Sequence, residues 1–243
     1  MIHATISNSV NTLFRYNTKH IVNFVRQFTP YQHAVVSYAQ EGEDLLLLRA
    51  IGDKGLGFYV DVGAHHPRRF SNTYLFYRRG WRGINIDAMP DSMKAFNKER
   101  PRDINIEAAI SDSNSEITYL MLNEPALNSF DAQLSCSRAQ GGAYRIIAEK
   151  KVLTRTLAQL LTEYLPQNQI IDFLSVDVEG MDLNVLRSND WNRFRPRLVL
   201  VECLSTESLQ TSLQAEVSQF LMEKKYLPFA KTFNTLLFNG GTE

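Results

Sequence analysis

The sequence has few of the features that mark nucleic-acid-binding, membrane-spanning or disulfide-stabilised proteins. Its 26 Lys and Arg residues balance 26 Asp and Glu residues, so a formal net charge of zero gives no bulk attraction to nucleic acid or to an acidic membrane. Two cysteines, Cys136 and Cys203, do not make a disulfide framework. We therefore expect a protein of the reducing cytoplasm with no nucleic-acid partner. No apolar run is long enough for a signal peptide or a membrane span, so we also expect no transmembrane segment.

Glycine is scarce at the strand-to-turn junction where nucleotide-binding proteins usually have a glycine-rich loop. Residues 58–67 read Phe-Tyr-Val-Asp-Val-Gly-Ala-His-His-Pro and predict a buried strand over 58–62 that runs into a tight turn. The turn holds one glycine, Gly63, so the G-x-G-x-x-G fingerprint is absent. The arrangement Asp61-x-Gly63 still lets a ligand approach the backbone beside a carboxylate. An ordinary strand-to-turn junction explains the stretch nearly as well.

A second strand that ends in an acid strengthens the interpretation as a site. Residues 73–79 predict a short amphipathic helix that stops at Gly80, and residues 83–87 predict a strand that ends in Asp87. Asp61 and Asp87 are therefore one strand–helix–strand unit apart. In nucleotide-binding folds an acid at the end of the second strand hydrogen-bonds the ribose hydroxyls.

The rest of the chain continues to alternate strands with helices, which predicts an α/β fold with a mostly parallel sheet and helices on both faces. Two final strands, 226–230 and 235–238, should be antiparallel because the connection between them is short. Ligands bind such sheets at the carboxyl ends of the strands. Further strands are expected over 104–110, 116–122, 170–176 and 198–201. Polar residues at the predicted edge form a candidate site: Asp61, Asp87, Ser111, Asp177 and Glu202.

Three segments differ from the pattern of alternating strands and helices. Residues 1–36 carry apolar residues at mixed helical spacing, which predicts a helical N-terminal extension to a domain over 37–243. The extension could pack on the domain or on a second copy of the chain, which would give a homodimer. Residues 123–150 show little periodicity, and we expect a loop that covers a ligand. Residues 207–225 should form one long amphipathic helix.

Four motifs occur in order along the chain: Tyr59–Pro67, Ser71–Tyr74 (Ser-Asn-Thr-Tyr), Gly80–Gly83 (Gly-Trp-Arg-Gly) and Leu174–Gly180 (Leu-Ser-Val-Asp-Val-Glu-Gly). Together they resemble the FkbM family of S-adenosylmethionine-dependent methyltransferases, over roughly residues 37–203. The resemblance implies a class I methyltransferase (Rossmann-like) fold, with a seven-stranded, mostly parallel sheet and an antiparallel last strand. It also implies S-adenosylmethionine as the cofactor and a hydroxyl oxygen as the methyl acceptor, typically on a sugar or a polyketide-type product.

Residue roles follow from the resemblance by position. Asp87 should take the ribose hydroxyls, and Asp177 should face the transferring methyl group and the acceptor. The family more often has Asn where His65 stands and Glu-Pro where Asp87-Ala88 stands. The cofactor-binding set that the resemblance implies is Gln40, Asp61, Gly63, Ala64, His65, Asn72, Asp87, Ala88, Ala109, Ile110, Ser111 and Asp177.

A sugar hydroxyl is a weak nucleophile until a base or a metal ion assists it. Candidate catalytic residues are Asp177, Glu179, Glu202 and His66. Asp177 with Glu179 could be a base with its partner, whereas Asp177 with Glu202 could hold Mg²⁺ on carboxylate oxygens. Glu179 could equally be a charge at a helix N-terminus, and His66 could equally fix the turn before Pro67.

We therefore expect an S-adenosylmethionine-dependent O-methyltransferase that acts on a hydroxyl of a sugar, a polysaccharide precursor, or a glycosylated or polyketide metabolite. One alternative is a non-catalytic cofactor-binding or assembly protein on the same fold. A second is a nicotinamide-dependent enzyme on a similar sheet, which the missing glycine-rich turn disfavours.

Overall fold

The computed structural model describes residues 33–203 and 208–241. The chain divides into two units, Met1–Val36 and Ser37–Glu243, and the fold given below is that of the second. The helical extension expected over 1–36 lies outside the described residues, apart from the four residues 33–36. No helix in the described ranges is both long enough and apolar enough to cross a membrane.

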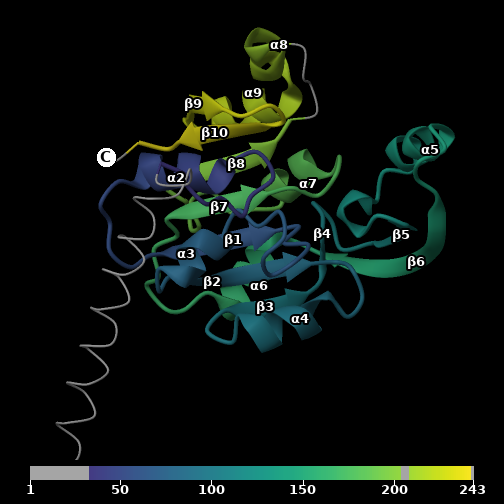
Figure 1. The fold of residues 1–243 in the computed structure, drawn as a ribbon, viewed down its shortest axis with the longest axis horizontal. Coiled ribbons are helices and arrows are strands. Elements are labelled where there is room, and N and C mark those ends of the chain that lie inside the picture. The colour runs from purple at the N-terminus through teal and green to yellow at the C-terminus, as the bar shows by residue number, and fades with distance from the viewer. Residues whose placement is uncertain (1–32, 204–207, 242–243) are drawn as a thin grey trace, which may run out of the picture. The chain divides into compact units, whose positions relative to one another are not determined.

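A seven-stranded sheet forms the centre of the fold, in the order β3-β2-β1-β7-β8-β10-β9 (Figure 1). The strands from β3 to β8 pair in parallel, whereas β10 is antiparallel to both of its neighbours. This arrangement confirms the predicted α/β fold of the class I methyltransferase type with its antiparallel last strand. The strands are β1 (Phe58–Val62), β2 (Arg82–Asp87), β3 (Ile104–Glu107), β7 (Phe173–Val176), β8 (Leu198–Glu202), β9 (Leu227–Lys231) and β10 (Thr235–Asn239).

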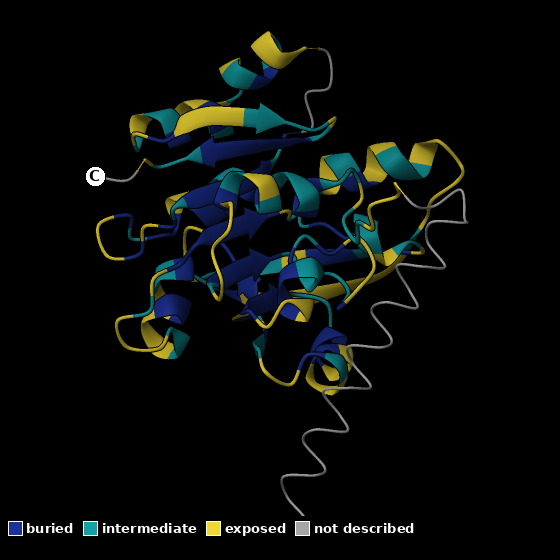
Figure 2. Ribbon diagram, turned by 60° about the vertical axis from the view of Figure 1, so that its left-hand side comes forward, coloured by how far each residue is buried: buried dark blue, intermediate teal, exposed yellow. Residues whose placement is uncertain are grey.

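Apolar residues on both faces of the central strands explain why helices cover the sheet on two sides. Phe58, Val60 and Val62 of β1 pack in one cluster with residues of α6, α7 and α9, while Tyr59 packs in another with α2 and α3. Figure 2 shows the central strands in dark blue, between helices that are exposed on their outer sides. The helices are α2 (Glu43–Ile51), α3 (Tyr74–Arg78), α4 (Ser92–Glu99), α6 (Leu157–Tyr164), α7 (Asp182–Arg187), α8 (Leu209–Gln214) and α9 (Glu216–Glu223).

The chain changes its direction of travel across the sheet between β1 and β7. After β1 it proceeds to β2 and β3 on one side, and it later continues from β7 to β8 on the other. Open α/β sheets bind ligands outside the carboxyl ends of the strands at such a switch point. The strand ends that carry the predicted acids Asp87 and Asp177 meet there.

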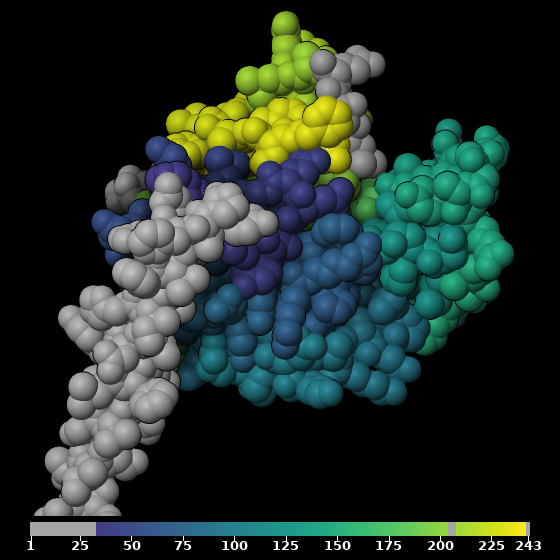
Figure 3. All heavy atoms as spheres, in the orientation of Figure 1, coloured from purple at the N-terminus to yellow at the C-terminus, as the bar shows by residue number. Residues whose placement is uncertain are grey.

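Residues 116–155 form a separate substructure, which we call the arm. Its two strands pair antiparallel, and the short β4 joins the C-terminal end of β6 in parallel. Figure 3 shows the arm as a teal lobe beside the main sheet. The elements of the arm are β5 (Glu116–Leu122), η1 (Pro125–Leu127), α5 (Ala132–Gln140) and β6 (Ile146–Arg155), and β4 (Ala109–Ile110) joins them from outside this range.

The arm shows that the expectation of an irregular loop over 123–150 was wrong. Asp131 caps α5, because its side chain accepts a hydrogen bond from the backbone N–H of Leu134 at 2.9 Å. Residues 146–150 belong to β6, whose side chains are mostly exposed. A strand that is exposed on both faces lacks the alternation of apolar and polar residues from which a strand is predicted.

Two expected strands differ from those observed. The strand expected over 104–110 breaks at Ala108, whose N–H donates to the carbonyl oxygen of Asp87 at 2.9 Å. As a result β3 joins the main sheet and β4 joins the arm. The strand expected from residue 170 begins at Phe173 instead, and Ile170 is exposed.

The single helix expected over 207–225 is two helices, α8 and α9. They are separated at Ala215, where the backbone is extended (φ −59°, ψ 145°). Beyond the break, the hydroxyl of Ser218 donates to the carbonyl oxygen of Ser212 at 2.7 Å. Hydrogen bonds from serine side chains to the backbone compete with the regular helical pattern, which favours the interruption here.

Candidate active site

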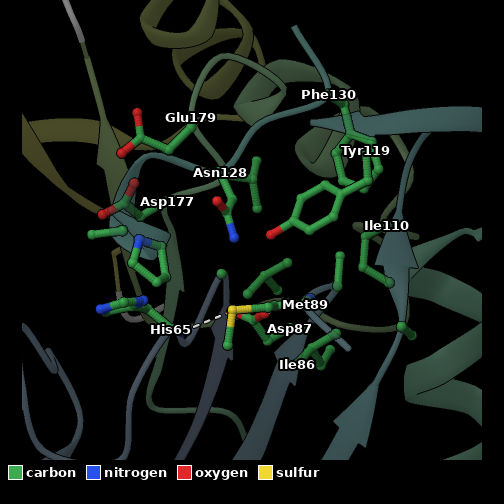
Figure 4. A pocket seen from close by; sticks show the side chains of 17 residues that line it. His65, Ile86, Asp87, Met89, Ile110, Tyr119, Asn128, Phe130, Asp177 and Glu179 are labelled. Carbon is green, nitrogen blue, oxygen red and sulfur yellow. Dashed lines mark hydrogen bonds between the residues drawn. The ribbon is translucent and has the colours of Figure 1, made fainter. Parts of the chain in front are cut away.

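A pocket lies at the switch point, against the carboxyl ends of β1, β2 and β7 (Figure 4). Its empty space is about 550 Å³, a value that includes the part open to solvent. The main sheet contributes residues from 62–65, 86–89 and 177–179. The arm closes the opposite side with Tyr119, Pro125, Ala126, Asn128 and Phe130.

Gly63 is required where β1 ends beside β7. Its φ is +84°, and a Cβ at this position would overlap the backbone carbonyl of Asp177. The N–H groups of Gly63 and Ala64 both donate to the carbonyl oxygen of Ile86, at 2.9 and 3.1 Å. The turn after β1 is therefore fixed to the end of β2, and a side chain at residue 63 would force it away from the end of β7.

Asp87 organises the floor of the pocket. Its carboxylate accepts the backbone N–H of His65 at 2.8 Å and that of Met89 at 2.7 Å, so it holds the turns after β1 and β2 together (Figure 4 draws the first bond). Burial raises the pKa of this carboxyl to about 6, although the two backbone donors act in the opposite direction. Each oxygen keeps a free lone pair, with which the ionised group can accept a ligand hydroxyl.

The wall of the pocket on the arm side is mainly apolar. Met89 and Ile110 line it together with the rings of Tyr119 and Phe130, which lie 4.7 Å apart between centroids. Tyr119 and Asn128 point toward one another in the centre of the view in Figure 4. A flat aromatic ligand could pack against this surface. Tyr119, Asn128 and Phe130 were not singled out from the sequence, although Asn128 and Phe130 lie in the segment 123–150 that was expected to cover a ligand. Their position depends on how the arm folds back.

His65 is neutral where it lines the pocket. Burial lowers the pKa of its imidazole to about 4, and the nearby cation Arg69 acts in the same direction. Its backbone has a φ of +52°, a left-handed conformation that is uncommon for a residue with a side chain. The adjacent His66 fixes the turn instead, since its Nδ1 accepts the backbone N–H groups of Arg68 and Arg69, both at 3.0 Å.

Three carboxylates gather beside the pocket. Asp177, Glu179 and Glu202 each place an oxygen within 4.8 Å of the others. Burial raises the pKa of all three, and their mutual repulsion raises the pKa of Asp177 and Glu202 further. Asp177 has surface open to the pocket, but protein surrounds it on its other sides, which accounts for the high pKa of an accessible group. Such a cluster binds protons or cations more strongly than isolated carboxylates do.

Two groups of polar contacts fasten the arm to the turns that follow β1 and β7. Arg69 donates to both oxygens of Glu124, at 3.0 and 3.2 Å. Arg138 of α5 forms an ion pair with Glu179, and the hydroxyl of Ser129 donates to the carbonyl oxygen of Glu179 at 2.6 Å. The arm thus positions one of the three carboxylates as well as closing the pocket.

The sequence matches the family described as methyltransferase FkbM domain over residues 61–228, which is more than half of the chain. The chain belongs to this family. The FkbM prediction is confirmed, and the family makes the protein a methyltransferase with S-adenosylmethionine as the implied cofactor. This favours methyl transfer over the nicotinamide alternative.

Two solved structures are similar to this FkbM protein. The C-terminal domain of precorrin-6Y C5,15-methyltransferase from Rhodobacter capsulatus is 12% identical, with a TM-score of 0.40, over 81% of this chain and 86% of that chain. A TehB-like SAM-dependent methyltransferase from Corynebacterium glutamicum is 11% identical, with a TM-score of 0.37, over 91% of this chain and 98% of that chain. No curated protein sequence matches the chain.

The pocket of the FkbM protein brings together only some of the residues predicted to bind the cofactor. Those that line it are Gly63, His65, Asp87, Ala88, Ile110 and Asp177. The others lie elsewhere. Gln40 is exposed, Ala64 packs against Met93 and Phe96, and Asn72 donates to the hydroxyl of Ser175 at 3.1 Å. Ala109 and Ser111 are buried next to the lining residue Ile110.

Asp61 turns away from the pocket into a buried polar network. It accepts a hydrogen bond from the hydroxyl of Thr73 at 2.9 Å. The guanidinium of Arg100, which is 0% exposed, donates to Thr73 at 3.0 Å, to Tyr59 at 2.8 Å and to Asp103 at 2.8 Å. Burial raises the pKa of Asp61, and Arg100 partly offsets the rise. Asp61 therefore stabilises the end of β1 from the side that faces away from the pocket.

Proposed function

We propose that this protein is an S-adenosylmethionine-dependent O-methyltransferase that acts on a hydroxyl of a sugar, a polysaccharide precursor, or a glycosylated or polyketide metabolite. Membership of the FkbM family supports methyl transfer. The observation that carries the choice of a hydroxyl acceptor is the group of three carboxylates beside the pocket, because a hydroxyl must lose a proton when it is methylated.

The residues around the pocket fit the cofactor. The carboxylate of Asp87 would accept the ribose hydroxyls, and the apolar wall that contains Met89, Ile110 and Tyr119 would take the adenine ring. When bound, the cofactor supplies a methyl group on a sulfonium, which an acceptor oxygen attacks in line. The protein contributes by holding the acceptor oxygen in position and by receiving its proton.

Asp177 is our candidate for the residue that receives the proton. Asp177 and Glu179 both line the pocket, but the carboxylate of Glu179 is already paired with Arg138. Burial and its acidic neighbours raise the pKa of Asp177, which makes it a stronger base than an isolated aspartate. Glu202 would then share the charge of the cluster. His66 is less suited, because its Nδ1 already accepts two backbone N–H groups.

A divalent metal ion is the second candidate for assisting the acceptor. The oxygens of Asp177, Glu179 and Glu202 lie close enough to bind one cation together, and Mg²⁺ prefers such oxygen ligands. A bound cation would lower the pKa of an acceptor hydroxyl directly and would remove the repulsion among the carboxylates. Turnover that is abolished by a chelator and restored by Mg²⁺ would support this version.

Transfer of a labelled methyl group from S-adenosylmethionine to a panel of sugar, glycoside and polyketide acceptors tests the proposal. Asp177→Asn should lower kcat by about 10²–10⁴-fold, the usual contribution of a general base. Glu163→Gln, on an exposed part of α6, is the matched control and should leave kcat unchanged. Unchanged turnover in Asp177→Asn would exclude this residue as the base. Cofactor binding without transfer to any acceptor would favour the non-catalytic assembly protein.

A further inference from the structure

The strand β6 has a free edge along most of its length. On one edge β5 pairs with it from Ile146 to Leu153, while on the other edge β4 reaches only Thr154 and Arg155. Among residues 33–203 and 208–241, no strand continues the sheet beyond β4 on that side. The backbone N–H and C=O groups of an unpaired edge are ready to bind another strand.

The hydrogen bonds at the end of β6 identify which residues face the free edge. The N–H of Thr154 donates to Ser115 on the β5 side, whereas the carbonyl oxygen of Arg155 accepts from Ser111 on the β4 side. Because these groups alternate along a strand, the backbone groups of Glu149, Lys151 and Leu153 face the β4 side as well.

The arm also leaves apolar side chains uncovered. Leu153 is 75% exposed and Ile147 is 58% exposed, although both lie in a strand. Charged residues commonly protect an edge strand from pairing, but here they stand between two exposed aliphatic side chains. A ribbon of two strands is marginally stable in water by itself, and added strands stabilise it. The edge is therefore better suited to a partner strand than to solvent.

We propose that β6 pairs antiparallel with β6 of a second copy of this chain, around a two-fold axis at Lys150. In this register Glu149 lies opposite the partner's Lys151. Leu153 lies toward the partner's Ile147, where a β-bulge between Ile146 and Ala148 ends the regular pairing of β6. Symmetry makes each of these contacts twice. Opposite charges and apolar pairs that face each other across strands are stabilising. The sequence of β6 is thus complementary to itself.

Neighbouring registers are less favourable. An axis on Glu149, on Lys150 or on Lys151 places one charged side chain opposite its own copy in each case. The axis on Lys150 is the one that also gives two Glu149–Lys151 pairs, and its single unfavourable contact is that of Lys150 with its own copy. Replacing that residue with threonine should therefore tighten the association. Pairing would join the two arms into one continuous sheet, in which each β5 presents Tyr119 to its own pocket.

Sedimentation equilibrium of the full chain tests the proposal through a charge exchange. Glu149→Lys and Lys151→Glu should each raise the dimer dissociation constant by roughly tenfold or more, because two attractive cross-strand pairs become repulsive. The double variant should restore wild-type association. Glu223→Lys, on the exposed end of α9, is the matched control and should change nothing.

Both substituted side chains are exposed, but Lys151 also pairs with Glu116 of β5 at 3.1 Å, so Lys151→Glu places two acids side by side within the arm. Circular dichroism of each variant therefore separates lost pairing between copies from a disturbed arm. A wild-type chain that stays monomeric at every concentration would overturn the proposal. So would a dimer that both single reversals leave intact, or a double variant that fails to recover. None of these outcomes depends on cofactor binding or turnover, so this inference stands apart from the proposed activity.

Discussion

Cofactor affinity should depend on pH through Asp87. The pKa of this carboxyl is raised to about 6, chiefly by burial. By the usual titration relation it is about nine-tenths ionised at pH 7 and about one-tenth ionised at pH 5. A hydrogen bond to an ionised acceptor contributes about 1 kcal/mol more than one to a neutral group. If Asp87 accepts both ribose hydroxyls, the two bonds together amount to about 2 kcal/mol, and the Kd for S-adenosylhomocysteine should rise roughly five- to tenfold as pH falls from 7 to 5.

Asp87→Asn provides the comparison that isolates this carboxyl. The variant should bind more weakly at pH 7, with a Kd near that of the wild type at pH 5, and its own pH dependence should be flatter. Other acids near the pocket and the groups of the ligand titrate equally in both proteins, so the difference between the two profiles belongs to residue 87. Calorimetric titrations at four pH values would measure it. Parallel profiles, or a wild-type Kd that does not change with pH, would refute the ribose contact.

The same pKa shift predicts how the stability of the unliganded protein responds to pH. The ordinary pKa of the carboxyl is 3.8, so between about 4 and 6 the folded chain binds more protons at residue 87 than the unfolded chain does. This residue therefore opposes folding increasingly as pH rises through that window. The cofactor should offset the effect where the group is ionised.

Three further predictions follow from the fold. Arg100→Met should lower the free energy of unfolding, measured in urea titrations, by about 3–5 kcal/mol, because it leaves the buried carboxylate of Asp103 without its cation. A loss under about 1 kcal/mol would show that the buried hydrogen bonds of Arg100 do not stabilise the fold as described. Gly63→Ala should cost at least about 2 kcal/mol and abolish cofactor binding, since the methyl overlaps the end of β7. Arg69→Ala removes a partly exposed pair with Glu124, so stability should change by less than about 1 kcal/mol, whereas stopped-flow should show faster cofactor dissociation; an unchanged rate would show that this pair does not hold the pocket closed.

The main sheet was predictable because its strands are recognisable as apolar runs in the sequence. Residues 58–62 and 198–201 are continuous apolar runs apart from Asp61, as expected for parallel strands that are buried on both faces. Asp87 stands where such a strand emerges at the edge, and the structure places it in the pocket. The alternation of strands and helices then fixed the edge of the sheet at which ligands bind.

Neither the fold of the arm nor which side chains near the strand ends point into the pocket could be predicted from the sequence. In β6 the run Glu149-Lys150-Lys151 is exposed, so no pattern distinguishes this strand from a loop. Asp61 and Val62 are neighbours on β1, yet successive residues of a strand point to opposite faces. Val62 lines the pocket, while Asp61 turns toward Thr73. Position near a strand end therefore did not ensure a place in the site.

The pocket at the ends of β1, β2 and β7 should hold S-adenosylmethionine. Isothermal titration calorimetry of the wild type and Asp87→Ala with S-adenosylmethionine and S-adenosylhomocysteine tests this prediction. We predict one site per chain with a micromolar Kd, about −8 kcal/mol, that the substitution greatly weakens. Absence of binding by folded wild-type protein, with and without Mg²⁺, would contradict the prediction.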